Sequence, residues 1–334
     1  MRRLRGCATW LEELLAYKLS QRLPTAPVAG LHVRLVDATR VCTPGSKGES
    51  WRIHAAYDPW LRQLVQIKIT DNTGGERLDR FDVQPGELLV GDRAYGRRPG
   101  LAHVVAQGGD FLVRITWYHV PLETREGQPF DLLAALKELP QDGIGEFEVR
   151  LKPDERHAVP GIACRLVAKR KPDKDALEAK RRAKIVAKKG GHKLDDRTLE
   201  ACEYFFVLTS LSPTVASAEQ VLALYRLRWQ IELEFKRLKS LLKLDDLRAK
   251  TPSTVRAALA AKMLGAVLVE DLVALRRNGA RHWHLTQIIG ECFRYSILGS
   301  QAAVRWMMQA TTKHTRARKA TRVLQCEATR ALLA

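Results

Sequence analysis

Apolar residues recur at helical spacing along residues 222–242, and the rest of the chain can be understood around this stretch. When the stretch is projected at about 100° per residue, its large apolar side chains fall within an arc of roughly 80°, wide enough for a core-facing surface. A second line of polar residues lies beside that arc within roughly 60°. The apolar positions are Leu224, Leu227, Ile231, Phe235, Leu238 and Leu242, and the polar line is Tyr225, Arg228, Glu232 and Lys239. We therefore expect one amphipathic helix with an aromatic residue, two cations and a carboxylate on one line, whereas Glu234 points roughly 160° away from Glu232.

The first seventy residues show the pattern of one helix followed by several strands. Residues 9–20 carry apolar side chains at helical spacing, with Thr9 as a possible N-cap. The β-branched or alternating runs 31–41, 51–57 and 64–70 are separated by turn-forming segments. These runs predict an antiparallel meander.

Two aspartates occupy unusual positions relative to predicted strands. Asp37 lies inside the apolar run 31–41, where a carboxylate is costly unless it is paired or binds a cation. The alternative is that Asp37 begins the following turn. Asp92 follows the buried run 88–90, at the kind of strand end where α/β sheets carry ligand-binding groups. It could equally be the N-cap of a helix over 99–107, and the sequence leaves both interpretations open.

The remaining elements are predicted by shorter patterns. The run around Trp117 and Tyr118 leads into a segment whose residues 174–193 are strongly basic, which suits either a solvated helix or a surface that follows phosphates. Either aromatic residue could stack on a base or pack in the core. A metal site is only weakly indicated by His282, Trp283, His284 and Cys292. The indication is weak because no fourth ligand stands at useful spacing. Further strands are expected at 111–117, 146–151, 161–171 and 203–210, and helices at 130–138, 253–275, 284–298 and 301–334.

The charge balance points to a polyanionic partner. The 334 residues contain 56 Lys and Arg against 37 Asp and Glu, a net charge of +19, concentrated in residues 151–200 and 301–334. Such an excess favours nucleic acid over an anionic membrane. The six cysteines form no CxxC pair, which favours a reducing cytoplasm over a disulfide framework. The longest apolar run, 257–275, is interrupted by charged residues, so it predicts a buried helix rather than a membrane span.

Three acids, Asp37, Asp92 and Glu232, could meet if the strands that carry the two aspartates are neighbours and the helix lies alongside. Converging carboxylates repel one another unless divalent cations neutralise them, and oxygen ligands select Mg²⁺ or Mn²⁺. Two such ions, about 3.5–4 Å apart, activate a water or a 3′-hydroxyl and stabilise the leaving oxygen of a phosphodiester. The pattern thus predicts phosphoryl transfer on nucleic acid.

With these three acids in this order, the sequence resembles a known family, the DDE transposases of bacterial insertion sequences, specifically the insertion-sequence-four group. The group's signature is Tyr, two residues, Arg, three residues, Glu, six residues, Lys, and Tyr225, Arg228, Glu232 and Lys239 keep every spacing. The segments LVDATRV and GDRAYG resemble the family's blocks around its first and second acids, and the segment GSKGESWRIHAAYD resembles the stretch that follows the first acid. The resemblance covers about residues 30–250.

The resemblance implies an α/β fold, an RNase H-like mixed sheet flanked by helices, with a strand-rich insertion before the last catalytic helix. It implies that Asp37, Asp92 and Glu232 are the catalytic metal ligands and that Tyr225, Arg228 and Lys239 contact DNA phosphates. The domains expected are a short helical segment (1–30), a catalytic core (31–117 and 203–250), a basic insertion (118–202) and a C-terminal helical region (251–334).

The activity implied is Mg²⁺-dependent cleavage at the ends of the element, with Mn²⁺ as a substitute, followed by strand transfer into target DNA. The partners implied are element-end and target DNA and further copies of the chain, in a homodimer or larger assembly on DNA. A bacterial, nucleoid-associated cytoplasmic location follows, with no membrane.

Two alternatives remain at this level. The first is a metal-dependent nuclease of the same fold that cuts without joining. The second is a truncated, non-catalytic DNA-binding relic, because family members often carry a longer N-terminal region than the thirty residues that precede the first strand here.

Overall fold

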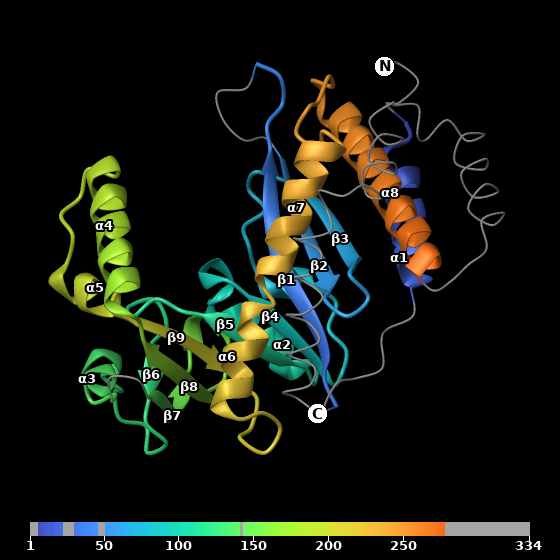
Figure 1. Ribbon diagram of the computed structural model, residues 1–334. Coiled ribbons are helices and arrows are strands. Elements are labelled where there is room, and N and C mark those ends of the chain that lie inside the picture. Colours follow the sequence, from blue (N-terminus) through green and yellow to red (C-terminus); the bar gives the residue numbers. More distant parts are fainter. Residues whose placement is uncertain (1–5, 23–29, 46–50, 141–142, 278–334) are drawn as a thin grey trace. The chain divides into compact units, whose positions relative to one another are not determined.

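The structure is a computed structural model that describes residues 6–22, 30–45, 51–140 and 143–277 (Figure 1). These residues form two compact units. The first holds the described residues 6–22, 34–45, 51–76 and 227–277, and the second holds 30–33, 77–140 and 143–226. The helices predicted over 284–298 and 301–334, and the weak metal pattern at residues 282–292, lie outside the described residues.

The first unit contains the predicted antiparallel meander, β1 (His32–Val41), β2 (Trp51–Asp58) and β3 (Gln63–Asp71). Every residue of β2 is buried, as expected for the central strand of the three. In the register of β1 against β2, Asp37 stands opposite Ala55. The strand therefore continues past Asp37 to Val41, and the alternative of a turn beginning at this aspartate is wrong.

Helices pack on this meander to build the first core. They are α1 (Ala8–Ser20), α7 (Trp229–Leu241) and α8 (Pro252–Arg277), and α1 lies against both α8 and β3 (Figure 1). The buried face of α1 repeats at helical spacing, through Leu11, Leu15 and Leu19. Its N-cap is Cys7, which makes no side-chain capping bond, so the expected cap at Thr9 is wrong by two residues.

The second unit contains a mixed sheet in the order β4-β5-β9-β8-β7-β6. β4 pairs in parallel with β5, and the other pairs are antiparallel. The strands are β4 (Glu87–Gly91), β5 (Asp110–Arg114), β6 (Leu122–Glu123), β7 (Ile144–Leu151), β8 (Ile162–Arg170) and β9 (Tyr204–Thr209).

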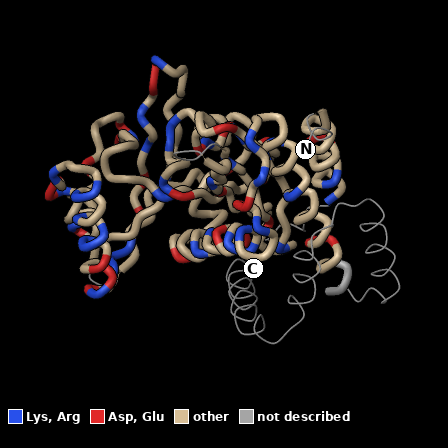
Figure 2. The backbone as a smooth tube through the Cα atoms, turned by 90° about the horizontal axis from the view of Figure 1, so that it is seen from above, with Lys and Arg blue, Asp and Glu red and all other residues tan. Residues whose placement is uncertain are grey.

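Helices and short 3₁₀ turns connect these strands. The helix α4 is rich in Lys and Arg, so the basic segment is helical over most of its length (Figure 2). The α-helices are α2 (Arg98–Ala106), α3 (Leu132–Lys137), α4 (Asp173–Lys189), α5 (Asp196–Ala201) and α6 (Ala218–Arg226). The 3₁₀ turns are η2 (Leu78–Arg80), η3 (Arg93–Tyr95) and η4 (Glu155–His157).

The single helix expected over 222–242 is two helices, because α6 ends at Arg226 and α7 begins at Trp229. The N–H of Gln230 donates to the carbonyl of Leu227 at 2.9 Å, three residues back, as in a tightened 3₁₀ turn. The stretch contains neither Pro nor Gly, so its sequence does not mark the break. The break falls at the boundary between the two units, which assigns Tyr225 to the second and Arg228, Glu232 and Lys239 to the first.

A buried ionic cluster joins α1, β3 and α8 within the first unit. Arg22, 5% exposed, donates to Glu270 at 2.8 Å and to Asp271 at 2.7 Å, and also to the carbonyls of Leu64 and Val267. The backbone N–H of Leu64 donates to the same oxygen of Glu270 at 3.0 Å. Breaking a buried ion pair from one side leaves an uncompensated charge, so this cluster fixes how the end of α1 docks.

Glu234 faces this core rather than solvent. Its side chain is 3% exposed and pairs with Arg237 at 2.9 Å. The pKa of Glu270 is raised from 4.5 to about 8, chiefly by burial and then by the charge of Glu234, against the opposing effect of Arg22. The sequence separated Glu234 from Glu232 correctly, but it did not indicate that Glu234 is buried.

We expect Glu270→Gln to remove a pH dependence from the stability of the chain. The folded state holds the proton of Glu270 up to about pH 8, whereas the unfolded chain releases it near 4.5. Between these values the folded state binds more protons, so the free energy of unfolding falls as the pH rises. Urea unfolding of both proteins across this range measures the effect as the difference between their curves. Parallel curves would show that Glu270 titrates as it does in the unfolded chain.

Candidate active site

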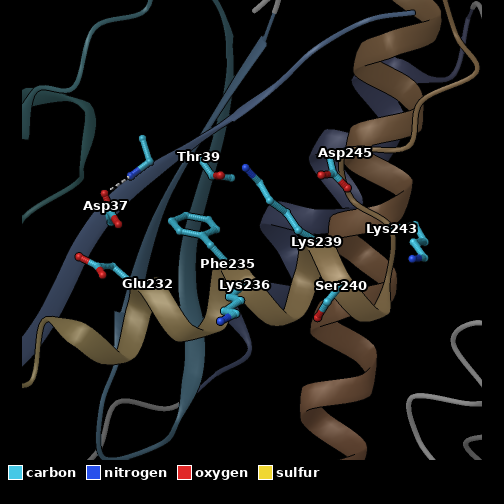
Figure 3. A pocket seen from close by; sticks show the side chains of 10 residues that line it. Asp37, Thr39, Glu232, Phe235, Lys236, Lys239, Ser240, Lys243 and Asp245 are labelled. Atoms are coloured by element: carbon cyan, nitrogen blue, oxygen red, sulfur yellow. Dashed lines mark hydrogen bonds between the residues drawn. The ribbon is translucent and has the colours of Figure 1, made fainter. Parts of the chain in front are cut away.

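A pocket of about 560 Å³ lies within the first unit, between β1 and α7 (Figure 3). Residues from two parts of the sequence that lie far apart, 37–39 and 232–245, line this pocket, and only the fold brings them together. The lining residues are Asp37, Ala38, Thr39, Glu232, Phe235, Lys236, Lys239, Ser240, Lys243 and Asp245. Two of the three predicted catalytic acids therefore share one pocket with one of the predicted DNA-contacting residues.

Asp37 reaches the pocket because of the alternation of β1. Leu35, Asp37 and Thr39 point to the same face of the strand, and Asp37 is the half-buried member between two buried neighbours. One oxygen of its carboxylate accepts a hydrogen bond from the backbone N–H of Ala38 at 2.8 Å. This bond to the charged form holds the carboxylate at the pocket wall.

Glu232 lies in the first turn of α7, where the helix dipole favours a negative charge. Its carboxylate pairs with the guanidinium of Arg228 at 2.5 Å, across one helical turn. The Arg228 side chain is 17% exposed and that of Glu232 is 31% exposed, so the pair stands at the border between core and solvent. Arg228 thus supplies a positive charge directly beside the predicted catalytic glutamate.

The pocket is divided by charge. The carboxylates of Asp37 and Glu232 lie at one end, beside the ring of Phe235, and the ammonium group of Lys239 extends toward Thr39 (Figure 3). Lysines and Asp245 line the part beyond this ring. Carboxylates suit a hard cation, and an ammonium group suits a phosphate. The arrangement can therefore hold a metal ion and a phosphodiester side by side.

The pocket also contains residues that the sequence analysis did not single out. Lys236 lies one turn after Glu232 on α7, and Lys243 and Asp245 follow the end of that helix. A helical projection that starts from Glu232 could have found Lys236, because the i and i+4 positions share a face. Lys243 has a positive φ of 52°, and this reversal of the chain at the helix end was not predictable from the pattern.

Asp92 belongs to the second unit, where it directly follows β4. One oxygen of its carboxylate accepts a hydrogen bond from the backbone N–H of Ala94 at 2.8 Å, which caps the 3₁₀ turn η3. The N-cap of α2 is Arg97, so the interpretation of Asp92 as the cap of that longer helix is wrong. The position at a strand end is as expected, and its half-buried side chain points into the turn that starts there.

Tyr225 also lies in the second unit, near the end of α6. Its side chain is buried, at 7% exposed, and its ring centroid lies 5.4 Å from that of Phe205 on β9. At the entrance to the insertion, Trp117 donates from Nε1 to Thr198 at 3.1 Å and packs beneath Arg197, whereas Tyr118 is 58% exposed. Of the two aromatic residues at the entrance to the basic segment, Trp117 is thus held by packing and Tyr118 is accessible.

The carboxylates of the pocket fit a magnesium-type ion. Mg²⁺ is usually held by one or two carboxylates, several waters and substrate phosphates rather than by a complete protein cage. Asp37 and Glu232 supply two such carboxylates. Within the described ranges, no group of three or more His, Cys, Asp or Glu side chains is placed to hold a metal ion.

Residues 29–268 match the protein family described as the transposase DDE domain. The chain belongs to the DDE-domain transposases. It is 39% identical over 276 residues to the putative transposase InsL for insertion sequence element IS186A of Escherichia coli (strain K12), covering 82% of this chain and 75% of that protein. It is also 39% identical over 276 residues to the transposase for insertion sequence element IS421 of Escherichia coli, covering 82% and 74%.

These matches show that the chain is a transposase of the insertion-sequence type, a class of protein that acts on DNA. The mixed sheets flanked by helices agree with the RNase H-like fold expected of this family. DDE transposase domains typically use divalent metal ions, which agrees with the carboxylates of the pocket. In the part of the chain that the structure describes, no helix has the length and apolar character needed to span a membrane.

Proposed function

We propose that this transposase belongs to the insertion-sequence-four group, cleaves phosphodiesters at the ends of its element and joins them to target DNA. One observation carries the proposal. Asp37 and Glu232 stand 195 positions apart in the sequence and line one pocket together with Lys239, in a chain that matches the DDE family.

Asp37, Asp92 and Glu232 are proposed as the acids that hold Mg²⁺, or Mn²⁺ in its place. When bound, two such ions supply an activated water or 3′-hydroxyl and stabilise the leaving oxygen. The chain's own residues orient this chemistry. The backbone of Ala38 fixes the carboxylate of Asp37, and Arg228 holds that of Glu232 through the ion pair at 2.5 Å.

Tyr225, Arg228 and Lys239 are proposed to contact DNA phosphates near the cleaved bond. Lys239 has the clearest support, because it lines the same pocket as the two acids and its ammonium group extends toward Thr39 (Figure 3). An ammonium group in this pocket can bind a phosphate oxygen and so offset the repulsion between the acids and the DNA. Arg228 would divide its hydrogen bonds between Glu232 and a phosphate.

We expect Lys239→Gln to weaken binding of element-end duplex and to make the plot of log K against log salt shallower by about 1, as for loss of one phosphate contact. Lys68→Gln, an exposed lysine on the strand β3, is the matched control. Titrations at several salt concentrations, without divalent metal, measure both quantities. Equal slopes for the two variants would show that Lys239 does not contact a DNA phosphate.

The activity itself is tested by incubating the full chain with duplex from the element's ends in Mg²⁺ or Mn²⁺ and separating the products. Nicks at the element boundary together with joined products support a transposase. Nicks without joined products identify the nuclease alternative. Salt-dependent binding without cleavage in either metal identifies the non-catalytic relic.

The domain organisation follows from the same proposal. Residues 31–117 and 203–250 would form the catalytic core, and the basic insertion 118–202 would extend the DNA surface through α4, where Lys and Arg gather (Figure 2). The chain would act as a homodimer or larger assembly on DNA, in association with the bacterial nucleoid.

A further inference from the structure

The strand registers of the second unit bring several charged residues to one edge of its sheet. β4 and β5 run parallel, and β9 runs antiparallel to both β5 and β8. The carboxyl ends of β4, β5 and β8 therefore meet at the same edge, together with the start of β9. Asp92 follows the first of these strand ends, Arg114 closes the second and Lys171 follows the third.

The same registers also determine which face of the sheet these side chains share. Arg114 stands opposite Val207, and Phe205, two residues before Val207, stands opposite Lys169. Paired residues share a face, and so do residues two apart along a strand. Continuing that alternation past the strand ends places Asp92 with Arg114 and places Lys171 with Lys169, all on the face that carries Phe205.

Contacts between side chains agree with this placement. The guanidinium of Arg114 lies over the ring of Phe205, 5.4 Å from its centroid, and Tyr225 packs on the same ring. Lys171 is half-buried and donates from Nζ to the carbonyl of Cys202 at 2.7 Å. The helix α6, which carries Tyr225, packs against β5 and β8, so it covers this face (Figure 1).

The charge at this edge is positive. The pKa of Lys171 is lowered from 10.5 to about 8, first by burial and next by the positive charge of Arg114, with Arg93 adding to the effect. Glu203, which directly precedes β9, accepts hydrogen bonds from Lys180 at 2.6 Å and from Arg170 at 3.5 Å. Cations that repel one another at a half-buried edge are stabilised when an anion binds between them.

We propose that Arg114 and Lys171 bind one phosphodiester of the DNA substrate at the edge of the sheet that carries Asp92, within reach of Tyr225. A phosphodiester matches this edge because guanidinium and ammonium groups both donate to phosphate oxygens. Phe205 holds Arg114 in place by stacking, so less side-chain freedom is lost when the phosphate binds. The inference rests on the proposed function, since it takes DNA as the substrate.

Binding of element-end duplex to the full chain, without divalent metal and over a range of salt concentrations, tests this pair. Lys171→Gln and Arg114→Gln are each expected to lower affinity about tenfold, in line with loss of a hydrogen bond to a charged group. The plot of log K against log salt becomes shallower by about 1 for each. Lys171→Arg is expected to retain the affinity and the salt slope of the wild-type chain. Lys174→Gln serves as the matched control, because Lys174 is an exposed lysine at the start of α4.

Duplexes with a single neutral methylphosphonate linkage locate the contact. At one linkage, neutralisation weakens binding by the wild-type chain but costs the Lys171→Gln variant nothing further. Wild-type affinity and salt slope in both Gln variants, or equal sensitivity of every variant at every linkage, overturns the inference. A chain that binds as described but does not cleave in Mg²⁺ or Mn²⁺ contradicts the proposed function and leaves this inference standing.

Discussion

Asp37→Asn and Glu232→Gln should each reduce strand cleavage about a thousandfold, which corresponds to several kcal/mol of lost transition-state stabilisation. Each substitution removes a charge from the same end of one pocket while keeping nearly the same shape. The amide cannot neutralise a divalent cation, so the chemistry should fail while the surrounding packing survives. We expect Asp92→Asn to have an effect of the same size.

The measurement is the rate of nicking of element-end duplex under single-turnover conditions in Mg²⁺ and in Mn²⁺. Binding of the same duplex without metal should be retained in all of the variants, because they add no negative charge. Glu13→Gln, an exposed carboxylate on α1, is the matched control and should cleave at the wild-type rate. Cleavage undiminished by Asp37→Asn and Glu232→Gln would show that the pocket is not the active site.

Arg22→Met should destabilise the chain by about 3–5 kcal/mol above pH 8, because it leaves the buried carboxylate of Glu270 without its cation. Arg22 contacts Glu270 and Asp271, and the carboxyl of Glu270 ionises with a pKa of about 8. Above that pH the wild-type chain gains the full attraction between Arg22 and the ionised Glu270. The variant must instead bury an unpaired charge or take up a proton.

Urea unfolding at two pH values on either side of 8 measures this loss. Arg256→Met is the matched control, because Arg256 also joins α8 to α1, through Glu12, but at an exposed site. Exposed pairs contribute about 0–1 kcal/mol, so the control should lose little. Adding Glu270→Gln to Arg22→Met should restore part of the stability. A loss no larger than that of the control would mean that water reaches the cluster.

The sequence predicted those features whose pattern is local. The meander around Asp37, the strand end at Asp92 and the helix of Glu232 each followed from alternation, turn residues or helical spacing. The signature spacing also singled out Lys239 as a candidate DNA contact. Lys239 lines the pocket because it lies on α7 about two turns after Glu232.

Long-range packing determined what the sequence could not predict. The break after Arg226 lies in a stretch of good helix formers, so only its tertiary surroundings can account for it. The sequence pattern suggests that Glu234 is solvated, because its burial and its contact with Arg237 depend on the packing around α7. Arg114 and Lys171 are 57 positions apart, and only the strand registers bring them to one edge.

The docking of α1 has a consequence for any attempt to shorten or redesign the chain. Through Arg22, the first helix reaches the same core that supports β3 and α8, so it is an integral part of the first unit rather than a detachable leader. A version that begins at the first strand would expose the faces of β3 and α8 that α1 covers. It would also leave the buried Glu270 without Arg22. The N-terminal segment therefore cannot be exchanged for a foreign DNA-recognition module at the strand boundary, and a fusion should be made ahead of α1.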